Sequence, residues 1–229
     1  MFKIFRLISL LIFVTFPFST SAHVQHYKDL NSIEFDIYRN NIHIGTHIFS
    51  FKKSGDELAI KSEIKFEIKK FGIVLYKYYA EGIEIYKGNK LIKFNSNTNQ
   101  NDKKKYVNIE LKDNEYIIDG SSYKGMVPTE FLIGTWWNHS IVEAKAQISA
   151  VSGRIIKQKV KFFGNETINF DEKSYNTLHF NFSSTDKKLV KNKKLDTDVW
   201  YDEKTLNWVK ASFDKKGKWE YRLVSVRNF

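Results

Sequence analysis

The chain has 229 residues, of which 42% are apolar and 16% aromatic, with only 2 prolines and 11 glycines, so its composition excludes a disordered or low-complexity protein. Cysteine is absent, which excludes disulfide bonds and a lipid-carrying cysteine behind a leader. The formal charge of +11 rests on 32 lysines and 5 arginines, and lysine lacks the planar fork that grips phosphate, so nucleic acid is not an expected partner. An anionic surface of the cell envelope stays a candidate partner for these lysines.

The first 22 residues match a secretory signal peptide. Lys3 and Arg6 supply the positive start, an apolar run extends from Leu7 to Phe18, and small residues precede a cleavage site after Ala22. The run is about 12 residues long, short of the roughly 20 that cross a bilayer. We therefore predict a signal peptide at 1–22, a single domain at 23–229, no transmembrane anchor after processing, and a periplasmic location.

The strongest pattern in the remaining chain is period-two alternation, which places apolar residues on one face of a strand. Between Leu58 and Ile68 the apolar residues alternate with lysine and glutamate, and Ser62 alone interrupts the apolar row. A strand of that length, roughly 36 Å at about 3.3 Å per residue, has to twist and curl. It suits a half barrel better than a compact sandwich.

Further strands follow from the same pattern along the chain. They are predicted at 33–38, 42–51, 73–79, 82–86, 91–96, 106–111 and 116–119, then at 155–163, 166–170, 176–182, 197–201, 206–213 and 218–226. Asn40-Asn41 and Gly164-Asn165 are among the predicted turns, and a short helix is predicted to start near Pro128 or Thr129. The fold class is therefore all-β: a single large antiparallel meander curled into an open or half barrel, with at most one short helix.

Motifs that carry chemistry are scarce. The sequence contains no phosphate-binding glycine loop, zinc pattern, nucleophile elbow or calcium loop. His43 and His47 are four apart and therefore predicted on the same strand face, but a metal would need a third ligand such as His179, and surface or groove histidines are the preferred interpretation. We expect no metal and no cofactor, and the catalytic residues, if any exist, are unknown.

Two enzyme hypotheses stay open beside that expectation. Cleavage after Ala22 would make His23 the first residue, and an N-terminal histidine can help to chelate copper. Paired carboxylates could serve glycoside hydrolysis, but Glu81 and Glu84 are predicted on opposite faces, and Asp196 with Asp198 is better explained by a strand rim.

Aromatic clusters are the most informative candidates for a site. Indole and phenol rings combine apolar area with a polar handle, and they fill the interior of a curved sheet or line a ligand groove. The candidate ligand-binding residues are Tyr79, Trp136, Trp137, Trp200 and Tyr201.

Short motifs in a fixed order give the chain a family resemblance. They are Asn41-Ile42-His43-Ile44-Gly45-Thr46-His47, Lys69-Lys70-Phe71-Gly72 leading to Tyr76-Lys77-Tyr78, Glu81 with Glu84-Ile85-Tyr86, Trp136-Trp137-Asn138, and Trp200-Tyr201-Asp202 with Trp208. Together they resemble the exported bacterial family catalogued as domain of unknown function 6134, with Tyr86 standing where tryptophan is more often expected. The resemblance implies an exported curved-sheet fold similar to periplasmic lipoprotein-carrier-like proteins, and no activity that could be carried over.

Three functions follow as hypotheses. The first is a non-enzymatic envelope protein whose curved sheet binds an apolar or amphipathic ligand such as a lipid. The second is an envelope enzyme, either a polymer hydrolase using residues such as Glu81 or Asp202, or a copper enzyme using His23. The third is a lysine-rich module that docks on anionic surfaces and releases when salt screens its charge.

Overall fold

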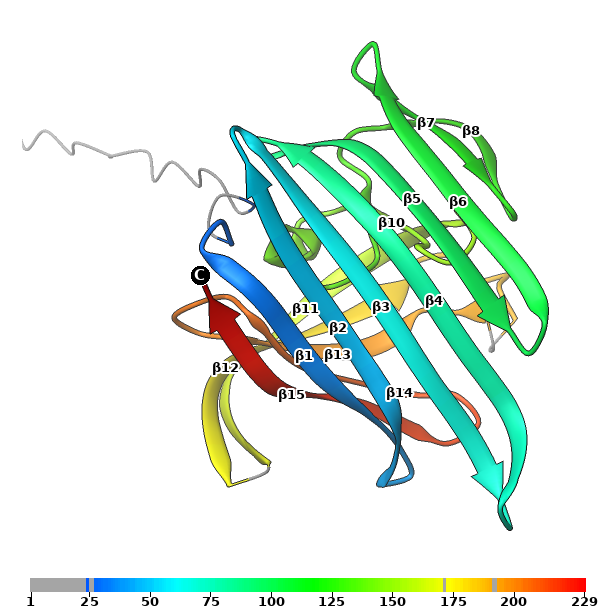
Figure 1. Cartoon of the computed structure of the whole chain (residues 1–229), viewed down its shortest axis with the longest axis vertical. Helices are drawn as coiled ribbons and strands as arrows, with labels where there is room; N and C mark the ends of the chain where they lie inside the picture. Colours follow the sequence, from blue (N-terminus) through cyan, green and yellow to red (C-terminus); the bar gives the residue numbers. More distant parts are fainter. Residues whose placement is uncertain (1–23, 25–26, 171, 191–192) are drawn as a thin grey trace, which may run out of the picture.

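The fold is described by a computed structural model covering residues 24, 27–170, 172–190 and 193–229; the predicted signal peptide and His23 lie outside these residues. Fifteen strands of the described chain join in one sheet (Figure 1). They are β1 (Leu30–Arg39), β2 (Ile42–Ser54), β3 (Glu57–Lys70), β4 (Ile73–Lys87), β5 (Lys90–Gln100), β6 (Lys103–Lys112), β7 (Glu115–Gly120), β8 (Lys124–Pro128), β9 (Leu132–Ile133), β10 (Ala146–Ile148), β11 (Ile155–Phe170), β12 (Lys173–Ser184), β13 (Asp196–Asp202), β14 (Trp208–Asp214) and β15 (Lys218–Asn228). This confirms the predicted all-β class.

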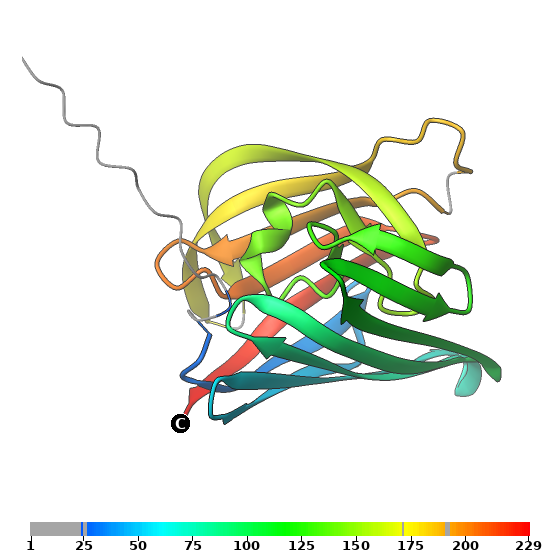
Figure 2. The ribbon, with the colours of Figure 1, turned by 90° about the horizontal axis from the view of Figure 1, so that it is seen from above.

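The order of strands in the sheet explains its shape. It runs β8-β7-β6-β5-β4-β3-β2-β1-β15-β14-β13-β12-β11-β10-β9, a meander whose first strand also pairs with its last. The two edge strands, β8 and β9, are consecutive in the chain and separated only by residues 129–131, so the sheet has to double over on itself. Figure 2 shows the result: β1–β5 form one wall and β11–β13 form the facing wall. The edges do not pair, so the sheet is an open barrel, as predicted.

Tight turns of asparagine and aspartate join several of the strands. Asn40-Asn41, Asn101-Asp102 and Asp113-Asn114 all have positive φ at both residues, between 49° and 68°. Two-residue hairpins of this kind match the right-handed twist of the strands, and asparagine and aspartate tolerate the left-handed conformation that they need.

Several details differ from the predicted elements. Gly164-Asn165 is not a turn, because Gly164 takes φ 118° in a bulge opposite His179 and β11 continues through it. The one short helix is the 3₁₀ helix η1 (His139–Val142), capped by Asn138 and lying ten residues after the predicted start. One pair, β9 with β10, is parallel, a departure from the all-antiparallel meander. Among the described residues, none of the helical structure is long and apolar enough to cross a membrane.

Residues 129–154, which we call the inner segment, run between the two walls (Figure 2). They carry β9, η1 and β10 and bring Trp136 and Trp137 into the interior. Trp137 is fully buried and meets Tyr27, Phe51 and Tyr86 at ring-centroid distances of 5.2, 5.6 and 5.7 Å. This packed half of the interior lies toward the β2–β3 and β4–β5 turns, which we call the closed end.

The other end of the curled sheet, which we call the open end, carries the β1–β2, β3–β4, β5–β6 and β14–β15 turns (Figure 1). Interior residues near it, including Tyr76, Tyr78, Phe213 and Trp219, are only half-buried. The core of the protein is therefore full at one end and incompletely filled at the other.

Candidate functional site

A cavity of about 240 Å³ lies in the interior between the inner segment and the wall formed by β2–β5. Its principal walls are His47, Ser62, Tyr78, Trp136, Trp208 and Tyr221. Trp208 is fully buried and lies 5.6 Å from Trp136 and 5.5 Å from Tyr221 between ring centroids. The walls thus combine aromatic and aliphatic side chains with polar groups such as Ser62 and Gln147, a mixture that is common in small-molecule sites.

His47 reaches this cavity because of a bulge in β2. Ile37 pairs with Gly45 and Tyr38 with His43, so Ile44 is an extra residue and the faces exchange between His43 and His47. His43 lies outside, 3.1 Å from Asp36, whereas His47 is buried. The prediction that the two histidines share a face is therefore wrong, because alternation fails across a bulge.

Burial lowers the pKa of His47 to about 3, so the imidazole is neutral in the folded protein. Its Nε2 lies 2.9 Å from the Ser62 hydroxyl. Ser62 is the one polar residue in the apolar row of β3, and the structure shows that it interrupts the row where the strand faces the cavity.

Three nitrogens of the cavity walls are buried without a hydrogen-bond partner among the described residues. They are His47 Nδ1, Trp136 Nε1 and Trp208 Nε1. Buried polar groups in proteins nearly always have partners, and each one left without costs about 1–3 kcal/mol. Three such groups therefore lie close together around one cavity, beneath its accessible surface.

A larger groove of about 860 Å³ adjoins the cavity at the open end. Tyr78 lines both, and its ring stacks on Phe66 at 4.7 Å, while Phe66 meets Trp219 at 5.2 Å. The groove walls carry more basic than acidic side chains, namely Arg39, Lys65, Lys69 and Lys77 beside Glu67 and Asp102. The groove and the cavity therefore share Tyr78, but Lys65, Lys69 and Tyr79 of the groove lie on the outer face of β3 and β4, whereas the cavity lies on the inner face.

Glu84 holds the inner segment against β4, below the cavity. Its Oε1 accepts hydrogen bonds from Trp137 Nε1 and Thr135 Oγ1, both at 2.9 Å, and its Oε2 accepts one from the Tyr86 hydroxyl at 2.8 Å. Burial raises the pKa of this carboxyl, and the three hydrogen bonds oppose that effect. Glu84 does not line the cavity, so we assign it a positioning role for Trp136 and Trp137.

The structure separates the five predicted ligand-binding residues. Trp136 lines the cavity, Trp137 lies in the packed core of the closed end, and Tyr79, 41% exposed, lines the outer groove. Tyr201 is buried and donates its hydroxyl hydrogen bond to the Trp136 carbonyl at 3.0 Å. Trp200, its neighbour in β13, points to the opposite face of the sheet.

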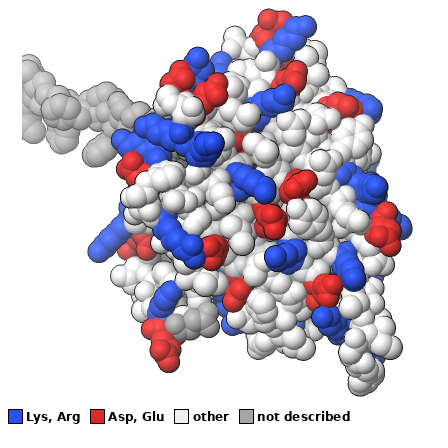
Figure 3. All heavy atoms as spheres, in the orientation of Figure 1, with Lys and Arg blue, Asp and Glu red and all other residues white. Residues whose placement is uncertain are grey.

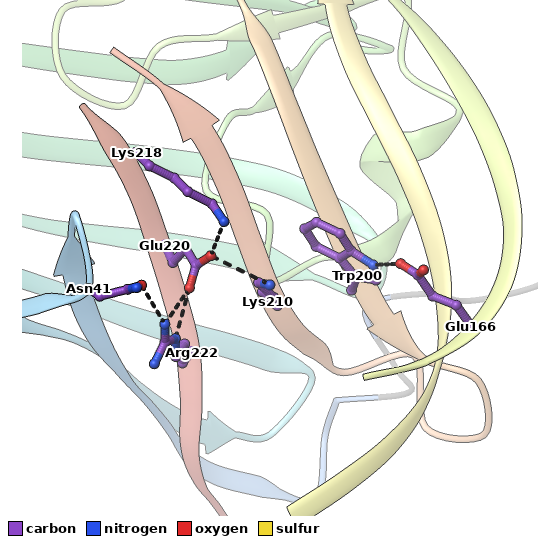
Figure 4. Close-up of polar contacts among 7 residues, drawn as sticks. All are labelled: Asn41, Glu166, Trp200, Lys210, Lys218, Glu220 and Arg222. Carbon is purple, nitrogen blue, oxygen red and sulfur yellow. Dashed lines mark hydrogen bonds and ion pairs between the residues drawn. The ribbon is translucent and has the colours of Figure 1, made fainter. Parts of the chain in front are cut away.

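Trp200 belongs to a polar array on the outer face of β11–β15 (Figure 4). Its ring stacks on His179 at 4.3 Å, Lys210 lies 4.9 Å above it, and its indole nitrogen donates to Glu166. In the same array, Glu220 pairs with Arg222 at 2.6 Å and with Lys218 at 3.1 Å (Figure 4). The polar groups here satisfy one another, as expected of a solvated sheet face.

Of the other chemical candidates, His179 and Asp198 meet at 3.0 Å on the outer face, whereas Glu81 and Asp202 lie apart. Glu81 accepts a hydrogen bond from Tyr79 on the outside of β4, and Asp202 caps the β13–β14 turn by accepting from Lys204 and Thr205. β4 and β13 are not neighbours in the sheet. Among the residues described, no three histidine or carboxylate side chains group closely enough to hold a metal ion.

Sequence reasoning named His47 only as a surface or groove histidine, and it did not propose Ser62, Trp208 or Tyr221 for a site. One signal existed for two of the cavity residues: a serine and a histidine stand in the apolar rows of adjacent strands, with Ser62 paired opposite Phe49 and His47 opposite Ile64. Nothing local marks Trp208 or Tyr221, which come to the cavity from β14 and β15 through the closure of the meander.

The fold and cavity define a β-barrel-like protein with a partly hollow interior. Residues 35–224 match the family described as domain of unknown function (DUF6134), and the chain belongs to that family, as its motifs suggested. Among curated proteins, none matches the sequence significantly.

Two solved structures are similar to the chain. One is the crystal structure of a beta-barrel-like protein of domain of unknown function DUF1849 from Brucella abortus, with a TM-score of 0.60 at 8% identity over 86% of this chain and 97% of that one. The other, a DUF1329 family protein from Desulfovibrio piger, covers 90% of each chain at 10% identity with a TM-score of 0.26, too low to support an argument. The first likeness supports the curled-sheet fold and carries no activity.

Proposed function

We propose that this protein is a non-enzymatic binder of an amphipathic ligand with a single apolar tail or ring, exported to the periplasm. The observation that carries the proposal is the interior cavity, whose lining includes the rings of Tyr78, Trp136, Trp208 and Tyr221. At about 240 Å³ it falls just below the roughly 300–1,000 Å³ of ordinary ligand sites, so it suits one chain or ring and excludes a lipid with several chains.

The groove at the open end supports the second half of the proposal. A ligand whose apolar part fills the cavity would pass Tyr78 and place its polar head toward Arg39, whose guanidinium lies 6.0 Å from the ring of the interior residue Trp219. Basic side chains favour an anionic head such as a carboxylate. The proposed ligand class is therefore an amphipathic anion, of which a fatty acid is the simplest example.

The test uses the chain without its predicted leader, purified gently, and the anionic dye 1-anilinonaphthalene-8-sulfonate as probe. We expect saturable dye fluorescence that dodecanoate displaces, and native mass spectrometry should show any co-purified mass. Ala80, which faces the cavity, provides the diagnostic variant: Ala80→Leu should fill the hollow and weaken dye binding by about tenfold, the effect of losing one buried apolar group.

Ala59, on the outer face of β3, provides the matched control, since Ala59→Leu adds the same atoms away from the cavity. It should leave dye binding unchanged. Dye binding that Ala80→Leu does not weaken, or that dodecanoate does not displace, would overturn the proposal.

A further inference from the structure

The β3–β4 hairpin extends beyond its neighbours at the open end. β2 pairs with β3 only as far as Phe66, and β5 pairs with β4 only as far as Tyr78. Residues 67–77 therefore form a two-stranded projection without a strand on either side, which we call the finger (Figure 1). A lone two-stranded hairpin gains little stability in water. Ile68 and Tyr76 at the base of the finger pack against the core, but its exposed end does not, so core packing does not explain that end.

Large apolar side chains occupy the end of the finger and face solvent. Phe71 is 93% exposed, Ile73 66%, Leu75 54% and Val74 36%. Ile42, 68% exposed, lies at the neighbouring β1–β2 turn and shares the groove with the base of the finger. Exposed apolar residues that occur singly are ordinary, but a group concentrated at one projecting point marks a contact surface.

The turn at the end of the finger begins with a phenylalanine, a residue that rarely adopts the positive φ required there. Phe71 and Gly72 have φ of 51° and 77°, the same left-handed geometry as the three turns built from asparagine and aspartate. A phenylalanine in this conformation is strained by about 1–2 kcal/mol, which asparagine or glycine avoids. Among the described residues, the Lys70 ammonium lies 5.5 Å from the centre of the Phe71 ring. Because the exposed ring adds backbone strain without packing in the core, we expect it to contact another molecule.

Positive charge surrounds this apolar point. Lys69 and Lys70 precede Phe71, and Lys77 lies at the base of the finger, with Glu67 as the acidic partner of Lys69 and Lys77. The adjoining turns add a basic rim: Lys103, Lys104 and Lys105 at the start of β6, and Lys215, Lys216 and Lys218 at the β14–β15 turn. Burial and the charges of Arg154 and Lys105 lower the pKa of Lys215, which shows how closely these cations gather.

The wall formed by β1–β5 carries charges of both signs (Figure 3). Figure 3 shows acidic and basic side chains interspersed over the wall formed by β1–β5, while the projecting end of the hairpin is uncharged with lysine close behind it. Turns at the closed end mix both signs, as in Lys112-Asp113-Asn114-Glu115. The complement of an apolar tip in a basic ring is an anionic surface with an apolar layer beneath it, and a membrane containing anionic lipid has that structure.

We propose that the finger, residues 67–77, docks the protein on an anionic lipid bilayer, with Phe71, Ile73 and Leu75 inserted below the head groups and the surrounding lysines on the anionic head groups. Docking would bring the groove near the membrane, because Glu67, Lys69 and Lys77 of the finger are part of its lining. This inference stands on the finger alone and does not require the ligand proposed above.

The test is flotation of the chain without its leader with vesicles of phosphatidylcholine containing 30% phosphatidylglycerol, and with pure phosphatidylcholine as comparison. We expect binding to the anionic vesicles only, reduced by high salt. Phe71→Asn should weaken binding by about tenfold, because one phenylalanine no longer leaves water, and Lys70→Gln by about fivefold for the loss of one charge.

Phe163 supplies a closely matched control. It is 53% exposed on β11, with the Lys161 ammonium 4.5 Å from its ring, but it lies on an opposite part of the sheet. Phe163→Asn should bind vesicles like the original protein. In a second measurement, Phe71→Trp should show a blue-shifted emission with anionic vesicles that the same change at Phe163 does not show.

Three results would overturn the inference. The first is that the protein does not bind anionic vesicles, and the second is that Phe71→Asn and Phe163→Asn lose vesicle binding equally. The third is that the protein forms a dimer that Phe71→Asn dissociates, which would show that the finger binds a second copy of the chain. Dye binding in Phe71→Asn should equal that of the original protein, so failure of docking and failure of ligand binding are measured separately.

Discussion

At the closed end, Trp137 is enclosed by Tyr27, Phe51 and Tyr86, and the carboxylate of Glu84 takes hydrogen bonds from three directions. At the open end, Trp136, the adjacent residue, borders a cavity and keeps a buried nitrogen without a partner among the described residues. Both ends use the same alternating strands and the same inner segment. The difference shows that the core is packed more completely at the closed end than at the open end.

The largest loss of stability is expected from removing the indole ring of Trp137 at the centre of the closed end. Trp137→Ala should lower the free energy of unfolding by about 3–5 kcal/mol, because a fully buried ring leaves a cavity and Glu84 loses a donor. Trp136→Ala should cost clearly less, since part of its ring already borders empty space. Urea unfolding of both variants measures the difference, and equal losses would contradict the division into a packed and a hollow half.

Glu84 should give the next largest effect. Glu84→Ala leaves the donors of Trp137, Thr135 and Tyr86 buried without an acceptor and should cost about 3 kcal/mol. Glu84→Gln keeps an oxygen for Trp137 and Thr135 and should be close to neutral. These two variants separate the loss of the hydrogen bonds from the loss of the charge.

The raised pKa of Glu84 also predicts a pH dependence. Because the folded pKa lies above the unfolded value of 4.5, the contribution of this carboxyl is complete below pH 4.5 and is lost as pH rises through the folded pKa. The stability of the original protein relative to Glu84→Gln should therefore fall as pH rises above 4.5. A difference that does not change with pH would show that Glu84 does not titrate abnormally.

His47 at the open end predicts the opposite slope. Its folded pKa of about 3 lies below the unfolded value of 6.5, so its contribution is complete above pH 6.5 and is lost as pH falls toward 3. Between pH 6.5 and 5.5 the stability should drop by up to about 1.4 kcal/mol more in the original protein than in His47→Gln. Thermal or urea unfolding of both proteins at matched pH measures this, and parallel pH profiles would contradict a buried neutral imidazole.

The smallest change in stability is expected at the tip of the finger, and there the substitution should stabilise the protein. Phe71→Asn places a residue suited to positive φ in the turn and should stabilise the protein by at most about 1 kcal/mol. A variant that is as stable as the original or more so, yet binds vesicles less, would separate docking from folding. A destabilised Phe71→Asn would show that the phenylalanine serves the fold after all.

The alternation of apolar and charged residues, the asparagine turns and the lack of cysteine were sufficient to predict an all-β chain in one curved sheet, because strand faces and tight turns are decided by neighbouring residues. The family was also accessible from the order of short motifs, such as Trp136-Trp137-Asn138. The predicted signal peptide and the periplasmic location stay predictions, since they concern residues outside the described chain.

What only the tertiary structure decided is which aromatic residues meet. Trp200 and Tyr201 are adjacent and equally suggestive in sequence, yet alternation in β13 sends one to the outer face and the other to the core. One bulge at Ile44 exchanges the faces of His43 and His47, and such a bulge depends on how β1 pairs with β2. The cavity needs β2, β14 and the inner segment together, and contacts between residues so distant in the chain arise from closure of the sheet, which no local pattern encodes.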